Sequence, residues 1–178
     1  MTPTEERFRQ VFNTVEPHIE RRYGVPIVIG DVVNPFTGDL SGAEIRIDYD
    51  LTPEEAVFIL VHLFGHTVQW NTSEYSREVG GRVANDPTPA HLDELHLYER
   101  EACRYSIQLF HDSGVRDLDQ WLADFHACDY AYLRHFYATR EKLPFKSFWK
   151  DGQPLLEPLP IPEFTPTRWF TRWQGTVV

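Results

Sequence analysis

The stretch LTPEEAVFILVHLFGHTVQWN, residues 51–71, carries the strongest structural signal in the chain. Thr52 is a favourable N-cap, and Glu55 three residues later completes the sequence pattern of a capping box. Pro53 falls at the first helical position, where an N–H would have no intrahelical partner in any case. Apolar residues then occupy nearly every side of the helix, which is typical of a helix buried all round. We therefore expect a central helix from Thr52 to about Asn71.

Two histidines within this helix indicate a metal site. His62 and His66 are four residues apart, so an α-helix places both imidazoles on one face, about one turn apart. Two imidazoles in this arrangement can bind one zinc ion. In metallopeptidases the corresponding motif is H-E-x-x-H, and its glutamate acts as the general base. Here the motif reads HLFGH, so both histidine ligands are present and Leu63 replaces the base.

The composition is that of one folded domain without a nucleic-acid-binding surface. The chain has 178 residues, of which 42% are apolar and 14% aromatic, which suits a single core. A net charge of −10 argues against the clustered lysines and arginines that nucleic acids require. No apolar run approaches the length of about 18 residues that spans a membrane, and the polar N-terminus is not a signal peptide. With only Cys103 and Cys128, we expect reduced thiols in a cytoplasmic protein.

Patterns elsewhere predict an α+β domain that spans residues 1–178. Helical spacing of apolar residues indicates three further helices, at about 4–22, 89–112 and 117–139. Residues 25–33 are rich in β-branched side chains, and residues 44–50 alternate apolar and polar, which predicts two strands paired antiparallel. The turn residues between them predict a loop. We expect a small, mostly antiparallel sheet packed on a bundle of four helices.

Two further segments lack a periodic pattern. Residues 71–90 contain glycines and prolines and predict a long loop, which in a compact domain is often functional. From Pro144 to the end, repeated prolines exclude a long helix or a central strand. Aromatic residues such as Trp149 and Phe164 are interspersed among them. We therefore expect residues 144–178 to form an extended tail that packs over the domain.

A zinc site needs a third protein ligand, and the second of the further helices offers one. Glu99 is three residues before Ala102 and points towards the core face of that helix, whereas Glu101 lies about 100° round from Ala102. We expect a solvated Glu101 and a buried Glu99. A buried carboxylate without a partner is costly, so Glu99 requires one. A metal ion bound by His62, His66 and Glu99 would supply it.

These motifs resemble those of a known family. HLFGHTVQ (62–69) is similar to the HEFGH or HELGH helix of gluzincin metallopeptidases. YEREACRYSIQLF (98–110) resembles the E-x-x-A-N-x-F-A helix of the ImmA/IrrE group of small zincins. The resemblance covers about residues 25–112 and implies a zincin-like fold, with Glu99 at the position of the third zinc ligand. The chain departs from the two motifs at Leu63, Cys103, Tyr105 and Ser106.

Leu63 determines which function the sequence predicts. In zinc peptidases the glutamate takes up a proton and passes it to the leaving amine, and such a base contributes roughly 10²–10⁴-fold. Leu63 has no group that accepts a proton. Our first hypothesis is a zinc-binding, metallopeptidase-like domain without peptidase activity that binds a peptide, protein or small ligand. The alternatives are a metal-free structural relic and an active hydrolase whose displaced base is one of His91, Asp93, His96 and Glu101.

Overall fold

The computed structural model describes residues 3–34, 36–81, 88–169 and 172–174, and it confirms the α+β class. Its helices are α1 (Glu5–Tyr23), α2 (Pro53–Thr72), α3 (Glu74–Gly81), α4 (Pro89–Asp112), α5 (Asp119–Thr139) and the 3₁₀ turn η1 (Phe145–Phe148). Its strands are β1 (Ile27–Gly30), β2 (Gly38–Leu40), β3 (Ile45–Asp48) and β4 (Arg172–Gln174). None of the described helices combines the length and the apolarity of a membrane span.

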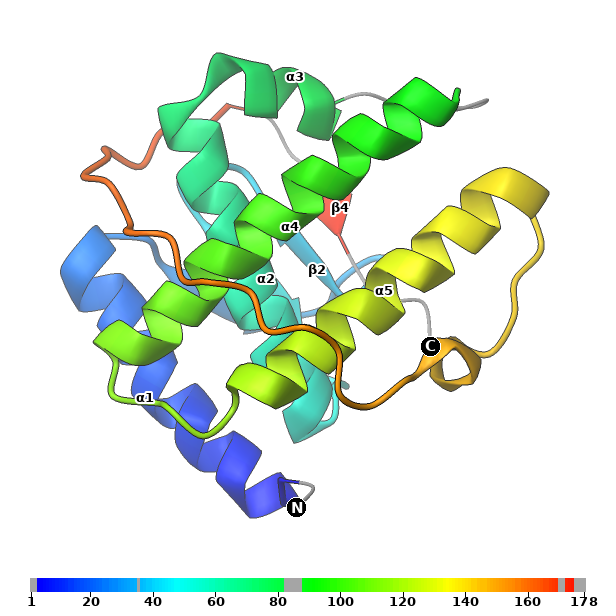
Figure 1. Cartoon of the computed structure of the whole chain (residues 1–178). Helices are drawn as coiled ribbons and strands as arrows, with labels where there is room; N and C mark the ends of the chain where they lie inside the picture. The colour runs from blue at the N-terminus through cyan, green and yellow to red at the C-terminus, as the bar shows by residue number, and fades with distance from the viewer. Residues whose placement is uncertain (1–2, 35, 82–87, 170–171, 175–178) are drawn as a thin grey trace.

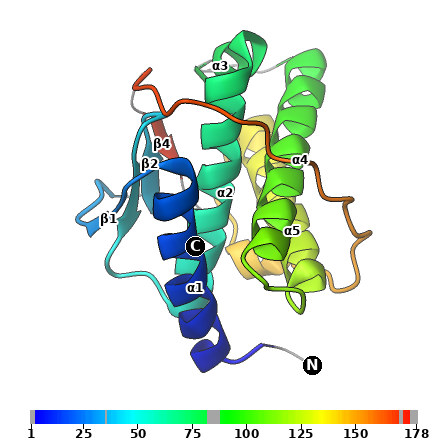
Figure 2. The ribbon, with the colours of Figure 1, turned by 90° about the vertical axis from the view of Figure 1, so that its left-hand side faces the viewer.

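Helix α2 is the centre of the molecule. It lies between the sheet on one side and the pair α4 and α5 on the other, and α1 runs beside it (Figures 1 and 2). Every residue from Val57 to Trp70 is buried. The predicted capping box is present: Glu55 N donates to Thr52 Oγ1 over 3.3 Å, and Thr52 N donates to Glu55 Oε2 over 2.9 Å. The prediction of a central buried helix is therefore confirmed.

The sheet is mixed, with strand order β1-β3-β2-β4. Strand β3 pairs in parallel with β1 and antiparallel with β2, and β2 also pairs antiparallel with β4. The expected antiparallel pairing of residues 25–33 with 44–50 is therefore wrong. Residues 38–40, which we expected to lie in a loop, form β2 instead. A short hairpin joins β2 to β3, so β2 takes the antiparallel position and β1 pairs along the other edge of β3.

The segment that we predicted as a long loop, residues 71–90, is helical in part. Helix α3 covers Glu74–Gly81 and continues almost directly from α2. Gly80 lies against two aromatic side chains, since a Cβ added there would be 2.5 Å from Tyr98 Oη and 2.8 Å from Trp70 Nε1. Gly80 therefore permits close packing of a helix, which differs from the predicted loop. Residues 82–87 of the predicted loop lie outside the described residues.

After η1 the chain runs without helix or strand from residue 149 to 169. It crosses the outer faces of α5 and α4 (Figure 1). On α4 the contact is a pair of hydrogen bonds: Leu159 N donates to Arg104 O over 3.2 Å, and Arg104 Nε donates to Glu157 O over 2.9 Å. Apolar side chains along this path pack against the core, namely Trp149, Leu156, Leu159, Ile161 and Phe164. The path then leads to β4.

Candidate metal centre

Helices α2 and α4 meet at a point of backbone contact. Gly65 of α2 faces Ala102 of α4, and a Cβ added at Gly65 would lie only 2.3 Å from Ala102 O. Glycine is therefore required here for the helices to approach so closely. His66 follows Gly65 directly, and Glu99 lies almost one turn before Ala102. This close approach brings polar side chains of the two helices within reach of one another.

The structure brings together the three residues that the sequence predicts as ligands. His66 Nε2 lies 3.2 Å from His62 Nε2 and 3.2 Å from Glu99 Oε2, and His62 Nε2 lies 3.6 Å from Glu99 Oε2. All three side chains are buried, with exposed fractions of 7%, 0% and 5% for His62, His66 and Glu99. Within the part of the chain that the structure describes, this is the one group of three or more potential ligands arranged to hold a metal.

Gln69 determines which nitrogen of His66 faces this group. His66 Nδ1 lies 2.8 Å from Gln69 Oε1. Gln69 Nε2 donates to Tyr98 O and to Glu101 Oε1, each over 2.9 Å, which fixes the orientation of the amide. Because the amide oxygen can only accept, His66 Nδ1 must carry a hydrogen and donate it. In the neutral ring, Nε2 then presents its lone pair to Glu99. Gln69 thus fixes the orientation of a candidate metal ligand, as hydrogen-bond partners of metal-binding histidines commonly do.

The geometry of the three residues fits a tetrahedral metal ion. Atoms that present lone pairs to one another repel at these distances unless a cation lies between them. Ligand atoms bound tetrahedrally to zinc at 2.0–2.1 Å lie about 3.3 Å apart. The observed separations of 3.2, 3.2 and 3.6 Å bracket that value. Two imidazoles and one carboxylate are also a ligand set that catalytic zinc sites use. The buried group can therefore hold a metal ion.

Glu99 supplies the negative charge of the site. Burial alone would raise the pKa of its carboxyl, but the charge and hydrogen bond of His66, with smaller effects of His62 and His126, lower the pKa to about 2. The carboxylate is therefore ionised at neutral pH. An ionised carboxylate in a buried position requires a positive partner. A proton on one imidazole or a bound cation would each meet that requirement, and the cation would satisfy all three ligand atoms at once.

His126 of α5 is a residue near the site that sequence reasoning missed. His126 is buried. One turn later on α5, Tyr130 donates to Leu92 O over 3.2 Å and packs on the His96 ring. These two contacts of Tyr130 fix how α5 lies along α4. Burial lowers the pKa of His126 to about 4, while the negative charge of Glu99 acts to raise it. His126 is therefore neutral at neutral pH and lies within electrostatic range of the carboxylate. In the sequence, only the position of His126 within an apolar stripe indicates that this residue is buried.

Leu63 faces the sheet. It is fully buried, and a Cβ added at Gly38 of β2 would lie 2.7 Å from Leu63 Cδ1. The position that carries the general base in H-E-x-x-H therefore holds an apolar side chain packed beneath β2. Nothing in this side chain can take up or release a proton.

The four residues considered as displaced bases are engaged elsewhere or exposed. His91 Nδ1 accepts from Thr88 N in the capping box of α4. Asp93 and His96 are exposed on the same helix. Glu101 is half-buried and accepts from Gln69, so our expectation of a solvated Glu101 is wrong. Its contact runs through Gln69 to the Nδ1 side of the imidazole, away from the ligand atoms.

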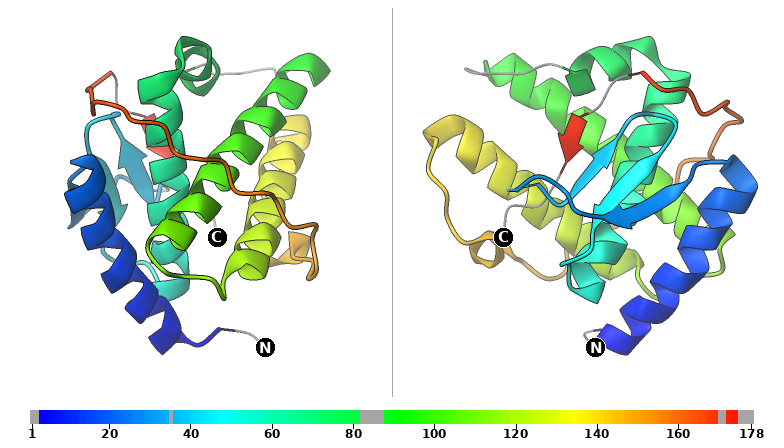
Figure 3. Two further views of the ribbon diagram at one scale, coloured as in Figure 1. Left: turned by 60° about the vertical axis from the view of Figure 1, so that its left-hand side comes forward. Right: turned by 180° about the vertical axis from the view of Figure 1, so that it is seen from behind.

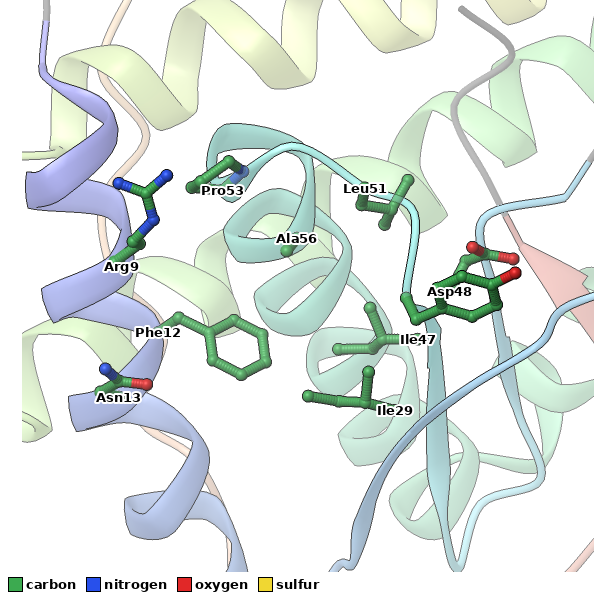
Figure 4. A pocket seen from close by; sticks show the side chains of 10 residues that line it. Arg9, Phe12, Asn13, Ile29, Ile47, Asp48, Leu51, Pro53 and Ala56 are labelled. Atoms are coloured by element: carbon green, nitrogen blue, oxygen red, sulfur yellow. The ribbon is translucent and has the colours of Figure 1, made fainter.

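A separate cavity of about 280 Å³ lies between α1, the sheet and the start of α2 (Figure 4). Its wall is largely apolar and includes Phe12, Ile29, Ile47, Leu51 and Ala56. The two charged residues of the wall have partners already. Arg9 Nη2 donates to Glu5 Oε2, and Asp48 accepts from the backbone N–H groups of Val32 and Asp50. None of the three candidate ligands lines this cavity, so it does not belong to the metal centre.

Comparisons with known proteins add no family to this description. The chain matches no protein-family model, no curated protein and no solved structure. The functional conclusion therefore depends on the geometry of the site.

Proposed function

We propose that this chain is a zinc-binding domain of zincin-like fold that binds a ligand at its metal centre and does not cleave peptides. The buried triangle of His62, His66 and Glu99, with its separations of 3.2–3.6 Å, carries the proposal. The order of a short sheet, a histidine helix and a glutamate helix supports the zincin-like part, as do the two motifs. Imidazoles bind a metal in their neutral form, so Glu99 would give the ligand set one negative charge, which favours a divalent cation.

In this proposal the protein holds the ion with preoriented side chains. The Tyr98 ring stacks on His66 with 4.4 Å between centroids, and the Phe58 ring stacks on His62 with 5.2 Å between centroids. These contacts restrict rotation of both imidazoles, and Gln69 fixes the tautomer of His66. A bound zinc ion would act as a Lewis acid on an oxygen atom of the ligand. The chain's own residues bind and orient the ion, and Leu63 gives the site no proton acceptor beside the first histidine.

A metal-dependent hydrolase with a displaced base is the second candidate, and His126 is the observation that favours it. The imidazole is neutral and lies near Glu99, so it has a lone pair available for a proton. Its pKa of about 4, however, is well below the neutral pH at which a general base acts best. Such an enzyme would be slow. Replacement of His126 by Gln should abolish any zinc-dependent hydrolysis that the chain shows.

Metal analysis of protein purified without a histidine tag tests the proposal. We expect one zinc ion per chain, lost in both His62→Ala and Glu99→Ala. His111→Ala is the matched control, because His111 is also on α4 but pairs with Asp119 outside the site. A broad peptidase and esterase screen should find no peptide cleavage. Unaltered protein that binds no zinc on titration would identify the site as a metal-free polar core and overturn the proposal.

A further inference from the structure

The segment that leads into β4 is held on α2 by one asparagine. Asn71 Oδ1 accepts from Thr167 N over 3.0 Å and from Trp169 Nε1 over 3.2 Å. Asn71 Nδ2 donates to Gly42 O over 2.7 Å, which fixes the orientation of the amide. Trp169 N also donates to Ser41 O over 2.8 Å. The side chain and the backbone of this segment are therefore both bound to the folded domain.

The same surface is shaped for the indole ring. The Arg77 guanidinium lies 3.9 Å from the centroid of the Trp169 ring, a close cation–π contact. Beneath the segment lies Gly42, with φ of 93°, and a Cβ there would be 2.4 Å from Thr167 O and 2.6 Å from Trp169 Cδ1. We call Gly42, Asn71 and Arg77 the tryptophan site. Gly42 leaves room for the segment, the amide oxygen of Asn71 is a fixed hydrogen-bond acceptor, and Arg77 supplies a cation. Together these three features favour an extended segment with one tryptophan.

Beyond the tryptophan site the chain adds a strand to the sheet. β4 pairs antiparallel with β2, with Leu40 opposite Arg172 and Gly38 opposite Gln174. Addition of an extended segment to a sheet edge is a common mode of peptide recognition, because backbone hydrogen bonds supply the affinity. Here the ladder is only three residues long, and it continues from a segment that the tryptophan site already anchors.

Strand β2 packs on α2 within one turn of the histidines. Ile59 and Leu63 face β2, since both would contact a Cβ at Gly38. At 100° per residue, the mean direction of His62 and His66 lies about 60° round from the mean direction of Ile59 and Leu63, towards the face that meets α4. Strand β4 and α1 lie at opposite sides of the sheet (Figure 3, right). β4 therefore extends the sheet beyond β2, on the side away from α1.

We propose that the tryptophan site and the outer edge of β2 form a docking surface for an extended, tryptophan-bearing peptide, and that the chain's own residues 167–169 and 172–174 occupy it as a built-in ligand. A free peptide of the same chemistry competes with that segment and binds along the outer edge of β2, the strand that packs on α2 within one turn of His62 and His66. This inference names the ligand class of the proposed function and rests on it for the role of the metal, whereas the docking itself requires no metal.

Competition by a labelled peptide tests the inference in the full chain. The probe is fluorescein-labelled TPTRWFTRWQ, which copies residues 165–174. In Trp169→Ala the built-in segment loses its anchor, so the probe should bind this variant at least tenfold more tightly than the unaltered chain. Leu155→Ala is the matched control, because Leu155 is an exposed residue of the same tail, with 59% of its surface accessible. It should bind the probe no better than the unaltered chain does.

Two further measurements decide the result. A second change, Asn71→Ala in the Trp169→Ala chain, should weaken the probe at least tenfold, as should alanine in place of the probe's first tryptophan. Amide hydrogen exchange of residues 38–40 should rise in Trp169→Ala and fall again when the probe is added. Equal probe affinity for the unaltered, Trp169→Ala and Leu155→Ala chains would overturn the inference, as would binding that survives loss of the probe's first tryptophan. Zinc content of the same samples separates this outcome from failure of the metal site.

Discussion

The two flanks of α2 are both buried, but different forces hold them. The flank towards the sheet and α1 is apolar, with side chains such as Leu63 and Phe64 packed against their neighbours. On the flank towards α4, His62, His66 and Gln69 each contact a polar group. Packing holds the first flank and tolerates changes that conserve volume and polarity. The second flank is stable only while every polar group keeps its partner. The buried polar groups of the second flank are therefore the feature of α2 that a functional role has to explain.

The largest effect is expected from a charge on the apolar flank. Leu63→Glu restores the H-E-x-x-H pattern but places a carboxylate in the apolar core beneath β2. We expect a loss of about 3–5 kcal/mol in the free energy of unfolding, which urea denaturation measures. Leu63→Met, which conserves volume, should cost less than about 1.5 kcal/mol. A stable Leu63→Glu chain that cleaves peptides would show that this side chain reaches the metal centre, and the comparison of the flanks would fail.

Acid should act on the polar side of the fold through His126. A lowering of its pKa from 6.5 to about 4 by burial corresponds to roughly 3 kcal/mol. The unfolded chain takes up this proton first, so the stabilisation is complete above pH 6.5 and is lost as the pH falls towards 4. The pKa of Glu99 is also lowered, to about 2, so its contribution is lost only below about pH 4.5.

Urea denaturation at pH 7 and pH 4 measures this effect. In His126→Gln the decline between the two values should be smaller by roughly 3 kcal/mol than in the unaltered chain. His18, whose pKa burial also lowers, contributes to both chains alike and cancels in the difference. An identical decline in both chains would show that His126 does not remain neutral in the folded state.

The contact between the two ligand-bearing helices should respond to a single methyl group. Gly65→Ala forces α2 and α4 apart at Ala102 O, which we expect to cost about 2 kcal/mol of unfolding free energy. The same change should weaken zinc binding, because it moves Glu99 away from the histidines. Gly30→Ala is the matched control, since a Cβ at Gly30 meets no atom within 4 Å. Equal stability of the two variants would mean that the helix contact does not determine the site.

The smallest effect is expected from the outer shell. Gln69→Leu keeps all three ligands but leaves His66 Nδ1 without an acceptor, so either tautomer of the ring becomes available. Loss of such a partner typically lowers metal affinity by roughly 10–100-fold, and we expect about tenfold here. Competition with a chromogenic chelator measures the change. Gln108→Leu, on the exposed face of α4, should leave the affinity unchanged. An unchanged affinity in Gln69→Leu would show that ring stacking alone orients the histidine.

Local signals in the sequence determined the parts of the fold that were predicted correctly. The capping box, the proline at the first position and the unbroken apolar run identify α2, because each acts within one or two turns of helix. The spacing of His62 and His66 and the offset of Glu99 from Ala102 likewise follow from helix geometry. These residues could be placed on faces of helices before any tertiary contact was known.

The features that the sequence did not reveal depend on contacts between distant segments. The parallel pairing of β1 with β3 follows from the place that β2 takes, and the three-residue β2 has too few residues for a periodic signal. Helix α3 begins directly after α2, and its glycines indicate a loop until Tyr98 is seen against Gly80. The roles of His126 and Trp169 follow from how α5 and the tail pack on other elements, which no local pattern records.

The backbone contact of Gly65 with Ala102 also bears on which cations the proposed metal centre would accept. Because the two helices already touch there, they cannot move closer to suit an ion of smaller radius. Stacked rings hold the imidazoles of His62 and His66 in place. The Glu99 side chain, with its rotatable bonds, is then the ligand that adjusts to ionic radius. The two histidines and the spacing of the helices would stay fixed. Discrimination between cations of different size would therefore depend on the rotamer of the Glu99 carboxylate.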